Sequence, residues 1–128
     1  MPQRKNILLV DDSEKITSLM KLFLINERGI KNIETANTLE DAEAFIALSA
    51  IDVVVLDIHF SRGSGMKLLK RLALYHPYIV TIVLTNHSDS FFKELSEKAG
   101  AGYFLDKSTE FEQVPGIISK LPIKPLLQ

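Results

Sequence analysis

Short apolar runs recur along this chain of 128 residues, and segments with a helical period separate them. Three of the runs are rich in Ile, Leu and Val, at Ile7–Val10, Val53–Leu56 and Ile79–Leu84. Weaker strand candidates lie at Asn32–Ala36 and Tyr103–Leu105. A continuous apolar run is typical of a strand buried on both faces, as in a parallel sheet covered by helices. The pattern therefore predicts five strands in such a sheet.

Between these runs, apolar residues recur every three or four positions, which is typical of amphipathic helices. Helices are predicted around Ile16–Phe23 and Leu39–Ile46, and again over 65–74 and 89–99. The candidate N-cap residues for three of these helices are Ser13, Thr38 and Ser88. Strand-then-helix units joined by right-handed crossovers give a doubly wound α/β fold with helices on both faces of the sheet.

The fifth unit is irregular. Thr109–Glu112 has the pattern of a capping box, yet Pro115 and Gly116 interrupt the helix that it should start. We therefore expect a turn and then a short helix near Pro115–Leu121.

The bulk composition excludes several classes of protein. A net charge of -1 without a long run of Lys or Arg argues against direct binding of nucleic acid. The absence of cysteine excludes disulfides, thiolate metal sites and a cysteine nucleophile. The N-terminus leads into only four apolar residues, too few for a signal peptide or a membrane span. We expect a cytoplasmic protein with no membrane insertion, a single domain over 1–128, its core at about 5–121 and a short tail at 122–128.

Polar residues follow the predicted strands at the end where ligands bind in open parallel sheets. They are Asp11-Asp12 after the first strand, Asp57 after the third, Thr85-Asn86 after the fourth and Lys107 after the fifth. Three carboxylates brought together repel one another by about a few kcal/mol per close pair, so a cation should join them. All-oxygen ligands favour Mg²⁺, with Mn²⁺ as the alternative. This arrangement suits phosphoryl transfer, with Asp57 as the nucleophile.

In order and approximate spacing, Asp11-Asp12, Asp57, Thr85 and Lys107 resemble the site of response-regulator receiver domains, over nearly the whole chain. The stretch Gly100–Lys107 also resembles the family's stretch before its lysine. The resemblance implies a flavodoxin-like sheet with strand order 2-1-3-4-5. It further implies a phosphoacceptor that takes a phosphoryl group from a histidine kinase or a phosphotransfer protein and then switches its partner-binding surface. Such a protein is not an enzyme in the usual sense, because it catalyses only its own phosphorylation and dephosphorylation.

The resemblance also implies a role for each matching residue. Asp57 is the phosphoacceptor and, together with Asp12, ligates Mg²⁺ directly. Asp11 holds a metal-bound water, and the backbone carbonyl of His59 completes the protein ligands. Lys107 pairs with the acceptor carboxylate and then with the phosphoryl group, where its compact ammonium acts as a point charge.

The resemblance implies that two further residues take part in the change of the partner-binding surface on phosphorylation. Thr85 moves to hydrogen-bond a phosphoryl oxygen, and Phe104 matches the family's switch aromatic. Taken singly, Thr85 is an ordinary strand residue and Phe104 an ordinary core aromatic. Added charge at the acceptor would bias a loop and the neighbouring helix face through these two residues.

Three residues near the site depart from the family's common choices. Ser108 follows Lys107 where the family has a proline after a cis peptide bond. A cis bond before a non-proline costs about 3 kcal/mol, so the bond is either strained or trans with Lys107 displaced. Asn86 is larger than the small residue preferred after Thr85 and is expected to narrow access for a phosphodonor. Ser61 replaces a proline that is common in the loop after the acceptor.

Histidines occupy the second positions after the acceptor and after the conserved hydroxyl. His59 and His87 are either two surface histidines at a wet rim or residues that border the phosphoryl group. Our hypothesis is that they modulate the attack of water on the aspartyl phosphate and make its lifetime pH-dependent near neutrality.

Three other functions remain alternatives. A pseudo-receiver keeps the fold and interacts without phosphorylation, and binding of Mg²⁺ and beryllium fluoride would distinguish it. A metal-dependent phosphatase usually has an Asp-x-Asp motif, whereas here Ile58-His59 follow Asp57. A flavodoxin needs a phosphate-cradling loop after the first strand, where Asp11-Asp12 would repel the phosphate. Among receivers, we expect a stand-alone one that acts by protein contact or phosphorelay, as a monomer or weak dimer, on an effector that the sequence does not identify.

Overall fold

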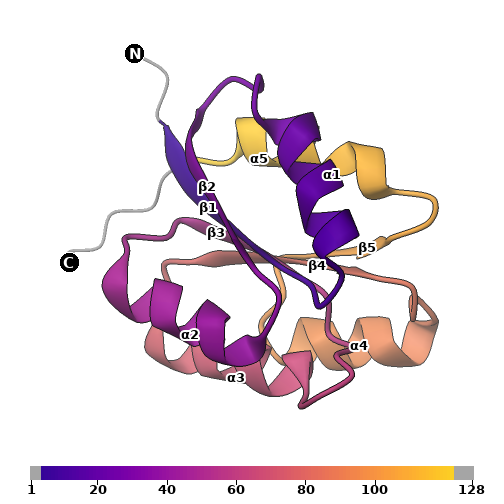
Figure 1. The fold of residues 1–128 in the computed structure, drawn as a ribbon. Helices are drawn as coiled ribbons and strands as arrows, with labels where there is room; N and C mark the ends of the chain where they lie inside the picture. The colour runs from indigo at the N-terminus through magenta and orange to yellow at the C-terminus, as the bar shows by residue number, and fades with distance from the viewer. Residues whose placement is uncertain (1–3, 123–128) are drawn as a thin grey trace.

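The computed structural model describes residues 4–122 and contains one five-stranded sheet between two layers of helices (Figure 1). The strands are β1 (Lys5–Val10), β2 (Ile30–Ala36), β3 (Val53–Leu56), β4 (Val80–Thr85) and β5 (Tyr103–Asp106). The helices are α1 (Glu14–Leu24), α2 (Leu39–Leu48), α3 (Gly65–Tyr75), α4 (Ser90–Lys98) and α5 (Val114–Lys120), with a 3₁₀ turn at Phe111–Gln113 before α5. Each predicted strand and helix is therefore present.

The sheet is parallel throughout, in the order β2-β1-β3-β4-β5. This confirms the expected doubly wound topology. Helices α1 and α5 cover one face of the sheet, and α2, α3 and α4 cover the other (Figure 1). The order reverses between β1 and β3, so the loops that follow these two strands part to opposite faces and leave room at the edge of the sheet.

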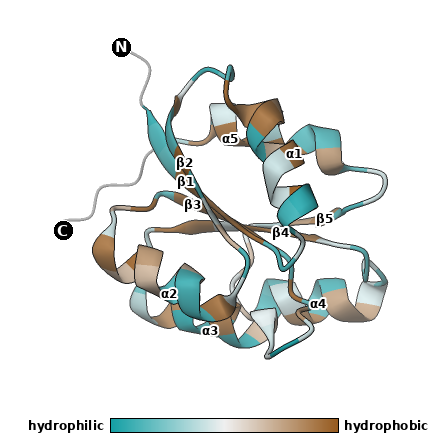
Figure 2. Ribbon diagram, in the orientation of Figure 1, coloured by the Kyte–Doolittle hydropathy of each residue, from teal (hydrophilic) through white to brown (hydrophobic). Residues whose placement is uncertain are grey.

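Alternating strand residues divide the core into two layers. Leu8 and Val10 of β1 face one cluster with residues of α2 and α3, whereas Ile7 and Leu9 face the other with residues of α1 and α5. Figure 2 shows brown segments along the central strands, whereas the helices carry both teal and brown residues. Burial on both faces explains why β1 and β3 have no alternating polar positions.

The helix caps agree with two of the three predictions. The hydroxyl of Ser13 accepts a hydrogen bond from the Ile16 N–H, and Thr38 caps α2 in the same way. The prediction for Ser88 is wrong, because Asp89 caps α4. Both residue types are good N-caps, and the Ser88 hydroxyl instead donates to the carboxylate of Asp106.

The fifth unit also differs from the prediction in one respect. The 3₁₀ turn and α5 make no capping hydrogen bond through a side chain, so the predicted capping box at Thr109–Glu112 is wrong. Pro115 lies in the first turn of α5. Backbone N–H groups in the first turn have no acceptor within the helix, so a proline there costs no hydrogen bond. It therefore begins the helix rather than interrupting it. The tail predicted at 122–128 lies outside the described residues except for Pro122.

Within residues 4–122, no helix has both the length and the apolar character that a membrane crossing requires.

Candidate functional site

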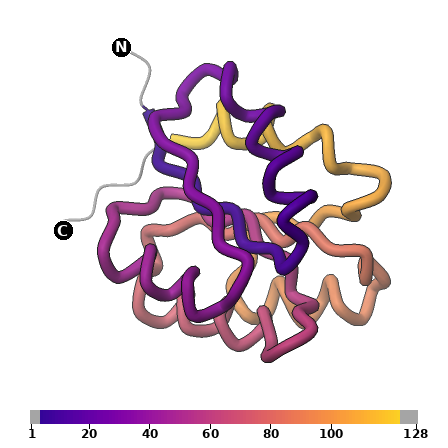
Figure 3. Tube along the Cα trace, in the orientation of Figure 1, coloured from indigo at the N-terminus to yellow at the C-terminus, as the bar shows by residue number. Residues whose placement is uncertain are grey.

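Lys107 joins two carboxylates at the edge of the sheet. Its Nζ lies 2.5 Å from Asp11 Oδ2 and 2.7 Å from Asp57 Oδ2. These residues follow β5, β1 and β3, and the loops after these strands gather at one end of the sheet (Figure 3). The parallel sheet thus brings together groups that are up to 96 positions apart in the sequence. The predicted convergence of these three residues is confirmed.

Burial strengthens this arrangement. The side chains of Lys107, Asp11 and Asp57 are 9%, 7% and 10% exposed, so water screens their charges weakly. Burial alone would lower the pKa of Lys107, but the hydrogen bonds and charges of the two carboxylates outweigh it and raise this pKa. Burial raises the pKa of Asp11, against the lowering effects of Lys107 and of the Ser13 N–H. Lys107 therefore stays charged at neutral pH and holds the two acids together.

Asp12 is the exposed member of the acidic set. Its Oδ2 accepts a hydrogen bond from the Ser61 N–H at 2.9 Å, which ties the loop after β1 to the loop after β3. No group of three acidic, histidine or cysteine side chains among residues 4–122 is arranged to hold a metal ion. Lys107 meanwhile donates to one oxygen of Asp11 and to one oxygen of Asp57.

The donor set nevertheless fits a hard divalent cation. Three carboxyl groups and one ammonium give a formal charge of -2 at this edge of the sheet, and every available side-chain ligand among the acids is an oxygen. Mg²⁺ and Ca²⁺ prefer such ligands, and Mg²⁺ keeps several of its waters when it binds. The chemistry of the predicted ligand set is therefore suitable, although the ammonium satisfies part of it here.

Thr85 lies at the end of β4 with its side chain fully buried. Its Oγ1 accepts a hydrogen bond from the His87 N–H at 3.1 Å and lies 3.5 Å from His59 Nδ1. The rings of His59 and His87 stack, with centroids 3.7 Å apart, and Phe92 of α4 packs edge-on against both. The two histidines therefore form a small aromatic stack beside Thr85, which their separation in the sequence did not predict.

The stack changes the environment of His59. Burial and the neighbouring charge of His87 lower the pKa of His59, which favours its neutral form. The His59 N–H donates to Asp57 Oδ1 at 3.0 Å, so the same residue contacts both the acid and the hydroxyl of the site. The placement of His59 and His87 beside Thr85 agrees with the hypothesis that they border the site, and their effect on lifetime stays a prediction.

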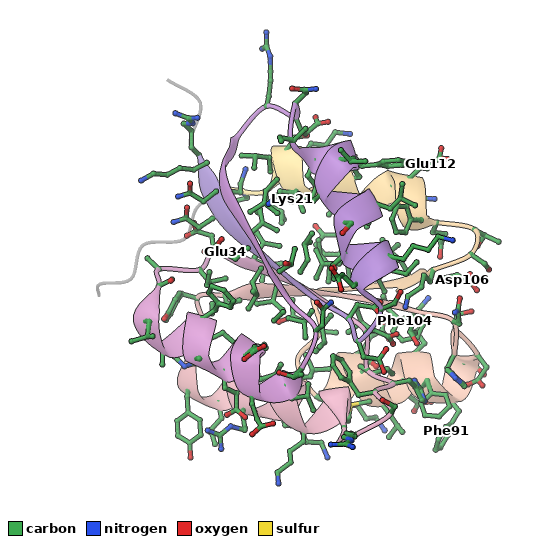
Figure 4. All side chains as sticks on the ribbon, viewed as in Figure 1. Lys21, Glu34, Phe91, Phe104, Asp106 and Glu112 are labelled. Atoms are coloured by element: carbon green, nitrogen blue, oxygen red, sulfur yellow. The ribbon has the colours of Figure 1, made fainter. Side chains whose placement is uncertain are left out.

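The remaining predicted residues lie around this centre. Asn86 is exposed, and Phe104 on β5 is half-buried against the core cluster that includes α2 and α3. Figure 4 labels Phe104 and Asp106 near the end of β5. All peptide bonds within 4–122 are trans, including Lys107–Ser108, so this bond does not have the cis form that was one of the two alternatives.

The sequence analysis did not identify Asp106, because an acid beside a lysine resembles an ordinary surface charge. Its carboxylate accepts hydrogen bonds from Ser108, Thr109 and Ser88, and these bonds, led by that of the Ser108 hydroxyl, hold the pKa of Asp106 well below its usual range. The run Asp106-Lys107-Ser108-Thr109 was the available signal, since an aspartate often accepts from backbone two and three positions later.

The chain matches the family model for the response regulator receiver domain over residues 7–119. Response regulator UvrY of Escherichia coli strain K12 is 29% identical over 113 residues, which cover 88% of this chain and 52% of that protein. The chain thus spans about half the length of this curated relative.

Solved structures show the same fold. A CheY-like response regulator receiver domain protein from Methanospirillum hungatei JF-1 gives a TM-score of 0.82 at 24% identity, covering 92% of this chain and 93% of that one. A response regulator protein from Burkholderia pseudomallei, with a phosphorylated aspartic acid, calcium ion and citrate, gives 0.77 at 24% identity, covering 86% of this chain and 64% of that one.

Proposed function

The chain belongs to the response regulator receiver domain family of two-component systems, and from this membership we propose that it accepts a phosphoryl group on Asp57. The observation that carries the proposal is the buried Lys107 ammonium, which bridges Asp57 and Asp11 at the end of the sheet where ligands bind. A buried lysine between two acids is costly to assemble unless its partners are well placed, and here it also prepares positive charge beside a carboxylate nucleophile.

The proposed reaction is a transfer from a phosphohistidine to Asp57. A carboxylate oxygen of Asp57 forms a bond to phosphorus while the bond from phosphorus to the donor nitrogen breaks and its electron pair returns to the donor imidazole. Lys107 can follow the phosphoryl oxygens, because its flexible stem lets the ammonium shift by a short distance. The donor is a histidine kinase or a phosphotransfer protein, as expected for this family.

Asp12 and Asp57 would bind Mg²⁺ or Mn²⁺ directly, with Asp11 acting through a water and His59 through its backbone carbonyl. Such an ion would neutralise charge on the acids and on the phosphoryl oxygens. This chain's part is to hold the oxygens in place: the Ser61 N–H fixes Asp12 Oδ2 at 2.9 Å. The chain catalyses only its own phosphorylation and dephosphorylation, and we propose that it does so in the cytoplasm.

Switching would begin at Thr85. Its hydroxyl now accepts from the His87 N–H, and a phosphoryl oxygen on Asp57 would offer that hydroxyl a charged acceptor. Movement of Thr85 toward the phosphoryl group would release the His87 backbone and leave space that the half-buried Phe104 can fill. The expected result is a changed surface on α4 and β5, where Phe91 and Tyr103 are exposed.

The proposal is tested by incubation with acetyl phosphate and Mg²⁺ followed by intact mass measurement. The parent should gain the mass of one phosphoryl group, and Asp57→Asn should gain none. Asp41→Asn, which changes an exposed acid of α2, is the matched control and should behave as the parent. A phosphoryl group that survives Asp57→Asn would show that the acceptor is wrong, and a parent that binds neither phosphate nor beryllium fluoride would favour the pseudo-receiver.

A further inference from the structure

Asp106 links the chain after β5 to the β4–α4 loop, and we propose that Asp106 and Ser88 are positioning residues that hold Lys107 for the transfer. This inference rests on the proposed function at Asp57 and adds a part of the machinery that the family match does not assign. Asp106 lies directly before Lys107 at the end of β5, and its side chain is directed to the β4–α4 loop rather than to Asp57.

One oxygen of Asp106 organises the chain that follows it. Oδ1 accepts from the Ser108 N–H at 2.8 Å, the Ser108 hydroxyl at 2.6 Å and the Thr109 N–H at 3.1 Å. An aspartate that accepts from the backbone two and three residues later closes a tight turn. Lys107 is the residue enclosed by this turn, so its backbone direction is set by the Asp106 carboxylate.

The other oxygen of Asp106 reaches the neighbouring loop. Oδ2 accepts a hydrogen bond from the Ser88 hydroxyl, and Ser88 lies between His87 and the N-cap of α4. Thr85 is the last residue of β4 before this connection, and its backbone carbonyl accepts from the Lys107 N–H at 2.9 Å. The loop with the hydroxyl and the loop with the ammonium are therefore tied together at two places.

Glu110 completes the restraint from the other side. Its Oε1 accepts from the Asp106 N–H at 2.8 Å, and its own N–H donates to the Asp106 carbonyl at 2.8 Å. Both peptide groups that flank Asp106 are thus engaged, together with its side chain. The hydrogen bonds of Ser108 and Ser88 hold the pKa of Asp106 well below its usual range, so the carboxylate accepts them over the whole neutral range.

This restraint matters because a lysine side chain alone does not fix the position of its ammonium group. Its ammonium ends a flexible four-carbon stem, and the place that it reaches depends on where the backbone starts. Ser108 provides no ring to restrain the chain after Lys107, and the Asp106 turn supplies a restraint at the same place. A misplacement of about 1 Å at a reacting group costs up to about a hundredfold in rate.

The test compares phosphorylation rates with metal affinity. Asp106→Ala and Asp106→Asn remove the turn or its charge, Ser88→Ala cuts the link between the loops, and Ser88→Thr keeps the hydroxyl. With acetyl phosphate and saturating Mg²⁺, we expect Asp106→Ala to slow phosphorylation about tenfold and Ser88→Ala less, with recovery in Ser88→Thr. The dissociation constant for Mg²⁺, measured by calorimetry, should stay at the parental value, because Asp11, Asp12 and Asp57 are untouched.

The controls are Glu112→Gln and Ser90→Ala, which change an exposed acid and an exposed hydroxyl close in sequence to the two positions. Parental rates in both Asp106→Ala and Ser88→Ala would overturn the inference while the proposed function stands. A slower rate with an equal loss of Mg²⁺ affinity and no recovery in Ser88→Thr would also overturn it, since it indicates a general structural defect.

A parent that takes no phosphate would refute the proposed function instead. The positioning role would then be decided by ¹³C relaxation of the Lys107 side chain in the unphosphorylated protein. Greater mobility in Asp106→Asn than in Glu112→Gln is the expected result. Equal mobility in the two variants would overturn the inference.

Discussion

Replacing Lys107 with methionine tests the electrostatic centre of the site. Lys107→Met keeps a long side chain of similar shape but removes the ammonium that lies 2.5 Å from Asp11 and 2.7 Å from Asp57. Both carboxylates are then left buried beside each other without a counter-charge. We expect a large loss of stability in the absence of metal, since an unpaired buried charge is far more costly than a missing surface pair.

The magnitude follows from burial. Removing one partner of a buried ion pair typically lowers the free energy of unfolding by about 3–5 kcal/mol. The site lies at the edge of the sheet, where water reaches the acids more easily than in the core, so we expect a loss of about 3 kcal/mol, at the lower end of this range. With a slope of about 1.5 kcal/mol per molar urea, the unfolding midpoint should fall by about 2 M. Lys98→Met is the matched control, because Lys98 pairs with Glu94 at 74% and 69% exposure. That change should cost less than about 0.5 kcal/mol.

The pH dependence gives an independent check. Burial already raises the pKa of Asp11, and loss of the neighbouring ammonium removes an effect that lowers it. A carboxyl whose folded pKa exceeds its unfolded pKa destabilises the fold when it ionises, and this penalty disappears as pH falls through the folded pKa. The difference in unfolding free energy between the parent and Lys107→Met should therefore shrink from pH 7 toward pH 4.

Urea unfolding with a chelator present measures both effects. A Lys107→Met midpoint equal to that of Lys98→Met would refute the reasoning, because it would mean that the buried carboxylates do not need the ammonium. A loss that is the same at pH 7 and pH 4 would show that the penalty is steric rather than electrostatic. Combining Lys107→Met with Asp57→Asn should recover part of the loss, since one of the two unpaired charges is removed.

Three further changes have definite expected outcomes. Gly65→Ala should destabilise by about 2 kcal/mol or more in thermal unfolding, because the new Cβ would lie 2.5 Å from the Asp57 carbonyl oxygen. Thr85→Val should cost about 1 kcal/mol, since it keeps the shape but leaves the His87 N–H without its acceptor, and NMR should show weaker shift changes in α4 on phosphorylation. His59→Asn with His87→Ala removes the stacked rings and should weaken the pH dependence of aspartyl-phosphate decay between pH 6 and 8. Decay curves identical to those of the parent would refute this hypothesis.

The strands and the main site residues were predictable because their signals are local. A run such as Val53–Leu56 can be satisfied only by burial on both faces, and a polar residue directly after it must lie at the edge of the sheet. Asp57 and Lys107 were therefore placed together by topology alone, without any knowledge of side-chain contacts. The trans bond at Lys107–Ser108 was one of two open geometries, and only the structure distinguishes them.

Contacts between loops could not be predicted in the same way. Ser88 and Asp89 are equally good caps in isolation; in the structure Asp89 caps α4 while the Ser88 hydroxyl donates to Asp106 at the end of β5. The stacking of His59 on His87 likewise joins two connections whose distance apart is set by the pairing of β3 with β4 in the sheet. In both cases a contact with a residue far away in the sequence selects one of several local conformations of similar energy.

The proposed chemistry requires the backbone at Lys107 to stay fixed while its ammonium moves. Both oxygens of Asp57 already accept hydrogen bonds, Oδ1 from the His59 N–H and Oδ2 from Lys107. An oxygen that attacks phosphorus loses electron density, so the ammonium gains by turning toward the phosphoryl oxygens and keeping Asp11 as its second partner. The long stem permits that shift, and the hydrogen bonds of Asp106 prevent the backbone from following it. Because Ser88 donates to the Asp106 carboxylate, a movement of the β4–α4 loop during the proposed switching would act on the carboxylate that holds the Lys107 backbone.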